Sequence, residues 1–549
     1  MTDAAAIRDR LNTLPTPTLQ DLFAADPRRL SALTGRIGWG EGEFAGSILF
    51  DWSKTHLDEA HLTAFEELAD AMDFAGRRDV LLNGGIANPT EGRAAEHTAQ
   101  RGVGNDASVE EAMALHQRMK LLVEAIRAQE LGHVKHLIHI GIGGSALGPA
   151  CALAMLARDV DAPLIDVHVV SNIDGCALED AMHACDPKTT MIAVASKTFT
   201  TIETMTNAES ALDWLRTGGV ADPYGRVVAL TASPEKAVEW GVDETRVLPF
   251  SETVGGRYSL WSSIGFPVAI ALGWDEFEEM LAGAQAVDVH FRDTEGRGNL
   301  CLRAAFADQL YTRLRGCQTR AVFAYDERLK LFPDYLQQLE MESNGKLVTM
   351  DGQPVDGPTA PITWGGVGTD AQHAVFQLLH QGTVLVPVDF IASIAPGDEL
   401  SPEHHRILLT NCFAQGAALM AGKPSDDPAR SYPGNRPSAT MLCDDMDAAT
   451  LGALIAFHEH RTFCNAVLMG INPFDQFGVE LGKQIANQIS GQIESGKGDP
   501  FDPSTEALLE AAGLKGGRTG RTVCNPPRTA HIASDLSGAI HDRPSRQPI

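Results

Sequence analysis

The spacing of hydrophobic positions changes near residue 115, and this change divides the chain. Before it, apolar residues recur at helical spacing between polar joints, as in 57–75 (LDEAHLTAFEELADAMDFA), which predicts helical pieces over residues 1–110. After it, short apolar runs alternate with amphipathic stretches, which predicts parallel sheets joined by right-handed crossovers. The predicted strands of this first alternation are 134–140, 165–170, 190–195 and 226–231, and its helices are 111–131, 146–158 and 203–215.

A second alternation of the same kind follows at roughly 305–505. Its predicted strands are 319–325 and 383–391, and its predicted helices are 371–380 and one that ends at Asn344-Gly345. Residues beyond 510 become rich in Gly, Arg and Pro and offer little for a core. We therefore expect a mainly helical segment over 1–114, α/β domains over 115–285 and 286–510, and a C-terminal extension over 511–549.

The amino-acid composition indicates which partners the chain is expected to bind and in which compartment it is expected to fold. The 44 basic and 72 acidic residues give a formal charge of −28, so we expect neither nucleic acid nor a membrane as a partner. The nine cysteines stand singly without a CxxC pair, and the first residues lack an apolar signal segment, so we expect reduced thiols in the cytoplasm. In so acidic a chain, cations inside Gly/Ser/Thr-rich loops are the best candidates for binding an anion.

Two loops that follow predicted strands have the composition of an anion site. Gly141-Ile-Gly-Gly144-Ser145-Ala opens a helix, and its glycines allow a ligand close to the backbone. This turn also fits the dinucleotide pattern G-x-G-x-x-A, and an ordinary tight turn remains an alternative. Ser196-Lys197-Thr198-Phe-Thr-Thr201 offers four hydroxyls and one ammonium at the carboxyl end of a strand, which favours phosphate. A helix N-cap would explain one of these hydroxyls but not the set.

Other polar residues are candidates for proton transfer. Glu340 and Glu342 are two apart on one helix and cannot share a face, so we expect one to be solvated and the other to point into a cleft. Arg257 follows two glycines and could stabilise an oxyanion or pair with a carboxylate for structural reasons.

Three further residues stand on predicted helices. His373 falls in the first turn of its helix, where a ligand could reach it, although a lone histidine is usually structural. Gln476 and Lys483 are seven apart, which predicts one helical face that is either functional or simply solvated.

The histidines do not show a metal pattern. His133, His136 and His139 are three apart around a strand, which puts neighbours on opposite faces, and His458-Glu-His460 lacks the H-E-x-x-H spacing. We therefore predict no metal site and no cofactor.

Taken together, the motifs resemble those of the glucose-6-phosphate isomerase family. GIGGSALGP, SKTFTT, GGRYSLWSSIG, QQLEMESNGK, GTDAQHAVFQLLHQGT and FDQFGVELGKQ occur in that family's order over residues 141–484. The resemblance implies two flavodoxin-like sugar isomerase (SIS) domains, each a three-layer αβα sandwich with a parallel sheet, plus helical extensions at both ends. It also implies interconversion of glucose 6-phosphate and fructose 6-phosphate through a cis-enediol, in glycolysis and gluconeogenesis, by a homodimer.

The resemblance also implies roles for individual residues. Glu342 would carry the proton, Arg257 would stabilise the enediolate, and His373, donated by the partner subunit, would open the ring with Lys483. The residues implied in substrate binding are Gly144, Ser145, Ser196, Lys197, Thr198, Thr201, Gln338 and Gln476.

Three alternative functions remain open. An isomerase of the same fold could act on mannose 6-phosphate, with the same chemistry but different hydroxyl contacts. A non-catalytic phosphosugar-binding regulator would need neither Glu342 nor Arg257 and would usually carry a basic DNA-binding helix, which we do not find. A dinucleotide-dependent oxidoreductase would bind NAD(P).

Overall fold

The computed structural model describes residues 3–40, 45–158 and 165–515. Spatial contacts divide the chain into two compact units, one ending at Asp475 and the other beginning at Gln476. From residue 516 on, the predicted C-terminal extension lies outside the described residues. Within the described part of the chain, no helix has both the length and the apolar composition needed to cross a bilayer.

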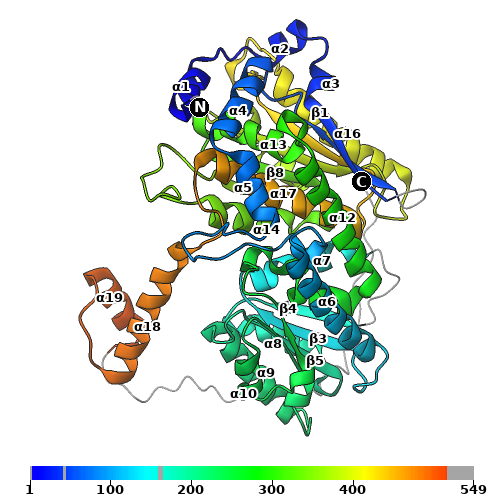
Figure 1. Cartoon of the computed structure of the whole chain (residues 1–549), viewed down its shortest axis with the longest axis vertical. Helices are drawn as coiled ribbons and strands as arrows, with labels where there is room; N and C mark the ends of the chain where they lie inside the picture. Colours follow the sequence, from blue (N-terminus) through cyan, green and yellow to red (C-terminus); the bar gives the residue numbers. More distant parts are fainter. Residues whose placement is uncertain (1–2, 41–44, 159–164, 516–549) are drawn as a thin grey trace, which may run out of the picture. The chain divides into compact units, whose positions relative to one another are not determined.

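The first sheet of the first unit is parallel throughout (Figure 1). Its strands are β3 (His136–Gly141), β4 (Asp166–Val170), β5 (Thr190–Ala195), β6 (Val227–Thr231) and β7 (Val247–Pro249). They lie in the order β4-β3-β5-β6-β7, which is the 2-1-3-4-5 order of flavodoxin-like folds. The predicted α/β class with parallel pairing is therefore confirmed for this sheet.

Helices cover both faces of the first sheet, because its strands are apolar on both sides. Leu137, Met191 and Val228 share one core with α6 (Asp106–Arg127), α7 (Gly144–Leu156) and α11 (Phe266–Leu272). Ile138, Ile192 and Val227 share another core with α8 (Gly175–Ala184), α9 (Ile202–Thr217) and α10 (Pro234–Trp240). The result is the expected three-layer arrangement.

The second sheet has a parallel part and an antiparallel part. Its strands are β8 (Thr319–Tyr325), β9 (Ile362–Val367), β10 (Val388–Ser393), β11 (Ser438–Cys443), β1 (Thr34–Trp39) and β2 (Gly46–Asp51). β8 to β11 pair in parallel, whereas β2 is antiparallel to β11 and forms a hairpin with β1.

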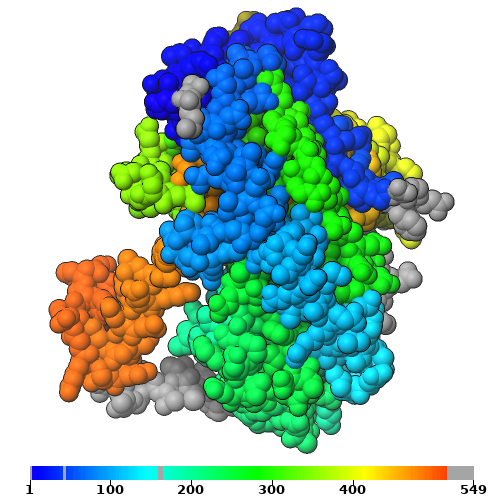
Figure 2. Space-filling view, in the orientation of Figure 1, coloured from blue at the N-terminus to red at the C-terminus, as the bar shows by residue number. Residues whose placement is uncertain are grey.

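The prediction that residues 1–110 are helical is therefore wrong over this hairpin, and the second sheet is mixed. Ile37, Ile48 and Phe50 are buried at alternating strand positions, and this short period-2 signal lies between helical segments. The other N-terminal elements are helical, namely α1 (Ala4–Thr13), α2 (Leu19–Ala25), α3 (Arg29–Leu33), α4 (Glu59–Ala71) and α5 (Phe74–Leu82). In the space-filling view, these N-terminal segments (blue) lie beside the green surface that includes α12 (Trp274–Asp293) (Figure 2).

Helices also cover both faces of the second sheet. Phe323, Val388 and Phe390 pack with α15 (Asp370–Gln381) and α16 (Pro402–Ala421). The opposite face packs in the large core with α13 (Leu300–Gln309), α14 (Phe332–Gln337) and α17 (Ala448–Met469). The second unit contains α18 (Glu480–Ser495) and α19 (Pro503–Ala511).

Helix α17 is buried along its whole length and packs closely on α12. Two glycines allow this approach: a Cβ on Gly283 would lie 1.9 Å from the Ala449 carbonyl oxygen, and one on Gly452 would lie 1.9 Å from that of Met280. Backbone atoms cannot move aside as a side-chain end can, so these positions require glycine.

We predict that Gly283→Ala lowers the free energy of unfolding by about 1–3 kcal/mol, because the added methyl group must push α12 and α17 apart. Gly491→Ala is the matched control, since Gly491 lies in α18 and a Cβ there would meet no atom within 4 Å. It should leave stability unchanged or raise it by up to about 1 kcal/mol. Thermal unfolding of both variants measures the change in their free energy of unfolding. A Gly283→Ala variant as stable as Gly491→Ala would contradict the close packing of α12 and α17.

Candidate active site

Two candidate loops follow adjacent strands at the carboxyl edge of the first sheet. β3 leads into the turn Gly141–Ser145, and β5 leads into the segment Ser196–Thr201. In the sheet, β4 lies on one side of β3 and β5 lies on the other. The order in which the chain adds strands to the sheet therefore reverses at β3. Ligands of open α/β sheets bind at such a switch point, and both predicted anion loops therefore lie where a ligand is expected.

The hydroxyls of the Ser196–Thr201 segment pair with each other. Ser196 Oγ lies 3.1 Å from Thr201 Oγ1, and Thr198 Oγ1 lies 2.9 Å from Thr200 Oγ1. Thr201 occupies the N-cap position of α9 but makes no side-chain capping bond. The N-cap explanation therefore fails for this residue, and the hydroxyls can turn toward a ligand.

Phe199 bends the backbone of the same segment. Its φ is +52°, a left-handed conformation that costs an L-residue roughly 1–2 kcal/mol. Its ring is buried and packs edge-on against Trp240. This packing holds the bend that sets Ser196 and Thr201 opposite each other.

Within the part of the chain that the structure describes, the Lys197 ammonium is hydrogen-bonded to backbone carbonyls and not to a carboxylate. Its Nζ donates to the carbonyl oxygens of Glu252 at 2.7 Å and Val254 at 3.0 Å. Burial, followed by the charge of Arg93, lowers the pKa of Lys197 to about 8. An anion beside this ammonium would favour the charged form.

The glycine turn touches two other candidate segments. A Cβ on Gly144 would lie 2.2 Å from the Gly256 carbonyl oxygen and 2.6 Å from the Arg257 nitrogen, while one on Gly143 would lie 3.1 Å from Gln338 Nε2. The absence of side chains at Gly143 and Gly144 therefore brings the turn, the Arg257 loop and the Gln338 helix together.

Ser145 follows in the first turn of α7. Its carbonyl accepts a hydrogen bond from Nε2 of His139 at 2.7 Å. Burial lowers the pKa of His139 to about 4, so the ring is neutral near pH 7 and acts as a support for the turn.

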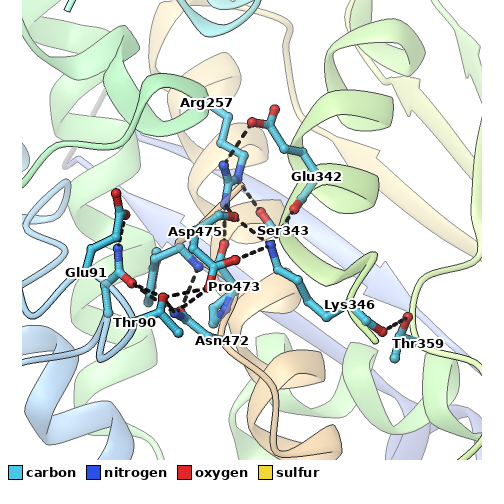
Figure 3. A network of polar contacts seen from close by, with 12 residues as sticks. Thr90, Glu91, Arg257, Glu342, Ser343, Lys346, Thr359, Asn472, Pro473 and Asp475 are labelled. Atoms are coloured by element: carbon cyan, nitrogen blue, oxygen red, sulfur yellow. Dashed lines mark hydrogen bonds and ion pairs between the residues drawn. The ribbon is translucent and has the colours of Figure 1, made fainter. Parts of the chain in front are cut away.

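Arg257 is buried at the centre of a polar cluster (Figure 3). Its Nε donates to Ser343 Oγ at 2.6 Å, and its Nη2 donates to the carbonyl oxygens of Pro473 and, at 3.2 Å, Asp475. Its Nη1 lies 3.3 Å from Oε1 of Glu342. Arg257 therefore has structural contacts, as one predicted alternative required, and it also lies beside Glu342, the candidate base.

Glu342 ends a π-helical turn, Gln338–Glu342, and its side chain is 22% exposed. Gln338 Nε2 donates to its Oε2 at 2.8 Å. Turns of this type are frequent at functional sites because they re-aim side chains. In Figure 3 the carboxylate extends from the helix toward Arg257.

The expectation that one of Glu340 and Glu342 is solvated is wrong. Glu340 is 4% exposed, pairs with Arg320 and accepts a hydrogen bond from Thr363. Burial raises its pKa, against the opposing effect of the Arg320 charge. Glu340 belongs to the core, and Glu342 is the carboxylate that remains accessible.

Several residues that hold this cluster were not singled out from the sequence. Lys346 Nζ donates to the Glu342 carbonyl at 3.0 Å and pairs with Asp475 Oδ1 at 2.9 Å. Asp475 Oδ2 in turn accepts from Thr90 at 2.7 Å and Asn472 at 3.0 Å. The i, i+4 spacing of Glu342 and Lys346 was the available signal, since it puts them on neighbouring positions of one helix.

The other candidate residues lie elsewhere. His373 is exposed on α15 and lines a cavity of about 620 Å³ with Phe376, His380 and Tyr432. Gln476 and Lys483 belong to the second unit, where α18 begins only at Glu480. The predicted helical face shared by Gln476 and Lys483 is therefore wrong, although Lys483 is exposed in the first turn of α18.

The family is decided by comparison with known proteins. A family model described as phosphoglucose isomerase matches residues 51–509. This chain belongs to the phosphoglucose isomerase family. Among members of the phosphoglucose isomerase family, a glucose-6-phosphate isomerase of Erythrobacter litoralis is 72% identical over 514 residues, covering 92% of this chain and 98% of the relative.

Two further members extend the match. A glucose-6-phosphate isomerase of Novosphingobium aromaticivorans is 71% identical over 503 residues, covering 92% of this chain and 97% of the relative. The crystal structure of a glucose-6-phosphate isomerase from Chlamydia trachomatis superposes with a TM-score of 0.82 at 28% identity, covering 94% of this chain and 99% of that one. The phosphoglucose isomerase resemblance stated from the motifs is confirmed.

We predict that Gly144→Ala weakens binding of inorganic phosphate on the order of tenfold, about 1.4 kcal/mol, because the methyl group displaces the Gly256–Arg257 backbone. Gly256→Ala is the matched control, since Gly256 is exposed and a Cβ there meets no atom within 4 Å. Calorimetric titration with phosphate measures the affinity of both variants. Equal affinities would contradict the role of the contact between Gly144 and the Gly256–Arg257 backbone.

Proposed function

We propose that the chain interconverts D-glucose 6-phosphate and D-fructose 6-phosphate through a cis-enediol, a step of glycolysis and gluconeogenesis. The observation that carries this proposal is the accessible Glu342 carboxylate held 3.3 Å from the buried Arg257 guanidinium. An aldose–ketose isomerisation requires one group that takes and returns a proton, and a cation that lowers the energy of the oxyanion. The family membership supports the same reaction.

The 6-phosphate binds the loops at the carboxyl edge of the first sheet. Ser196, Thr198 and Thr201 donate hydroxyl hydrogen bonds, and the Lys197 ammonium offsets the phosphate charge. Ser145 adds a hydroxyl from the start of α7. This role is supported by the bent backbone at Phe199 and by the carbonyl partners of Lys197, which hold the ammonium without neutralising it.

Glu342 takes the proton from C2 of the open-chain aldose and returns it to C1. Arg257 stabilises the negative oxygen of the enediolate between these two transfers. Gln338 and Gln476 bind sugar hydroxyls, while His373 and Lys483 assist ring opening. As C1 receives a proton, the hydroxyl proton passes from O2 to O1, so the product is an isomer of the substrate and no co-reactant is needed.

The active form is a homodimer in which His373 comes from the partner subunit. Its exposure on α15 is consistent with donation to another chain. We place the enzyme in the cytoplasm, which suits the unpaired thiols of the described residues.

We predict that Glu342→Gln lowers kcat by about 10²–10⁴-fold, because the amide cannot accept the proton. KM should change little, since the amide keeps the size of the side chain. Glu239→Gln, at an exposed position of α10, is the control and should retain wild-type activity. Cofactor-free assay of fructose 6-phosphate formation measures both, and an active Glu342→Gln enzyme would contradict the role of this carboxylate.

Affinity for sorbitol 6-phosphate, which has no carbonyl to react, should be highest between pH about 6 and 8. The phosphate becomes a dianion above its second pKa of about 6. Lys197 loses its proton in the free enzyme above its lowered pKa of about 8, so affinity falls as the pH rises further.

Calorimetry as a function of pH tests this assignment. Lys197→Arg should lose the decline above pH 8, because a guanidinium remains charged there. The same decline in wild type and Lys197→Arg would exclude Lys197 as its source.

Co-expression of His373→Ala and Glu342→Gln chains tests the shared site. A heterodimer purified through two different tags would contain one complete site, with Glu342 from one chain and His373 from the other. It should show about half of the wild-type activity, although each parent homodimer is nearly inactive. A heterodimer as inactive as its parents would contradict donation across the interface.

A further inference from the structure

Three side chains of metal-ligand type meet at the amino edge of the first sheet. His136 begins β3, His168 lies in β4, and Cys185 directly follows α8. One nitrogen of each ring and the thiol sulfur all lie within 4.8 Å of one another. Within the described residues, this is the one place where three His, Cys, Asp or Glu side chains converge in this way.

The strand register brings these residues together. His136 pairs with Asp166 of β4 and with Thr190 of β5, and Ile138 pairs with His168. Alternate residues of a strand share a face, so both histidines project toward the helical layer that contains α8. Cys185 stands at the end of α8, where the chain returns to the sheet to begin β5.

The two rings present nitrogens without hydrogen-bond partners. His136 Nδ1 and His168 Nε2 are buried and have no hydrogen bond among the described residues. Asp166 Oδ2 lies 3.3 Å from His168 Nε2, outside hydrogen-bond geometry. An unpartnered ring nitrogen also occurs on His61, His139, His458 and His460, but at this edge two such histidines converge with a thiol.

We propose that His136, His168 and Cys185 bind a Zn²⁺ ion, with Asp166 or a water as the fourth ligand. Zn²⁺ prefers four-coordinate sites of imidazole, thiolate and carboxylate, whereas Mg²⁺ and Ca²⁺ prefer oxygen. Bond lengths of about 2.0–2.3 Å put tetrahedral donors about 3.3–3.6 Å apart, so the site closes with small side-chain rotations. The His168 side chain is 24% exposed and Asp166 is 63% exposed, which gives the ion a path from solvent.

The expected role of this ion is structural. The site lies at the amino ends of the strands, whereas the loops of the candidate active site follow their carboxyl ends. Zn²⁺ would connect β3, β4 and the segment that leads into β5, and its binding would release the Cys185 proton. Isomerisation does not depend on it.

The test uses the full chain without an affinity tag, after treatment with a chelator. Titration with Zn²⁺ should show one ion per chain and raise the melting temperature, because the ion binds the folded state. Co²⁺ in the same site should show tetrahedral d–d bands and a thiolate-to-metal charge-transfer band. A wild-type protein that binds neither ion, or a cobalt spectrum without the thiolate band, would overturn the proposal.

Matched variants locate the site. Cys185→Ser and His168→Gln should weaken Zn²⁺ binding on the order of 100-fold or more, and Cys185→Ser should abolish the thiolate band. Cys176→Ser and His183→Gln change exposed residues of α8 and should bind as wild type. If Cys185→Ser does not fold, His168→Gln decides the question. Unchanged binding by the folded site variants would show that the ion binds elsewhere and would overturn the assignment.

Discussion

A guanidinium that leaves water needs an acceptor for its N–H groups, and Arg257 meets this constraint with atoms from distant parts of the chain. Its acceptors are the Ser343 hydroxyl, the carbonyls of Pro473 and Asp475, and the Glu342 carboxylate. Removing an acceptor leaves an N–H group of the buried guanidinium without a hydrogen bond, which typically costs about 1–3 kcal/mol. The need to satisfy Arg257 therefore fixes the helix that carries Glu342 against the segment before Asp475.

The same constraint explains why the glycine turn matters. Gly144 packs against the Gly256–Arg257 backbone, so the loop after β3 and the loop that carries Arg257 form one support. Lys197 reaches the same region from the other side, since it is bound to the carbonyls of Glu252 and Val254, just before Gly255. Among the described residues, Lys197 forms no ion pair with a carboxylate, whereas Arg101 pairs with both Asp288 and Glu459. In a chain with a formal charge of −28, this arrangement preserves local positive charge for an anionic ligand.

Much of the fold could be predicted from the sequence because its strong signals are local. The buried strands Thr190–Ala195 and Thr319–Tyr325 are found at their predicted bounds, since continuous apolar runs between turns leave little ambiguity. The β1–β2 hairpin was missed because its alternation is short and interrupted by Gly35 and Gly38. The candidate site shows the same contrast between local and distant signals. Ser196–Thr201 shows its chemistry in its side chains, whereas carbonyl acceptors such as that of Pro473 leave no mark in the sequence.

The roles of some residues depend only on their tertiary neighbours and cannot be predicted from the sequence. Glu340 has the same residue type as Glu342, and only its contacts with Arg320 and Thr363 show that it belongs to the core. His136, His168 and Cys185 come from three separate segments, and no spacing along the chain relates them. For Glu340, the deciding information is the π-helical turn that buries it. For the two histidines, it is the pairing register of β3 and β4.

We propose that Glu342, beside Arg257, carries a proton between neighbouring carbons. Isomerisation of glucose 6-phosphate in deuterated water, followed by NMR of the product, tests this most directly. Because the acidic proton of a carboxyl group exchanges with solvent, we expect deuterium at C1 of the fructose 6-phosphate formed. Product that stays free of deuterium even after repeated interconversion would mean that hydrogen passes directly from C2 to C1 as a hydride, and would contradict proton transfer by Glu342.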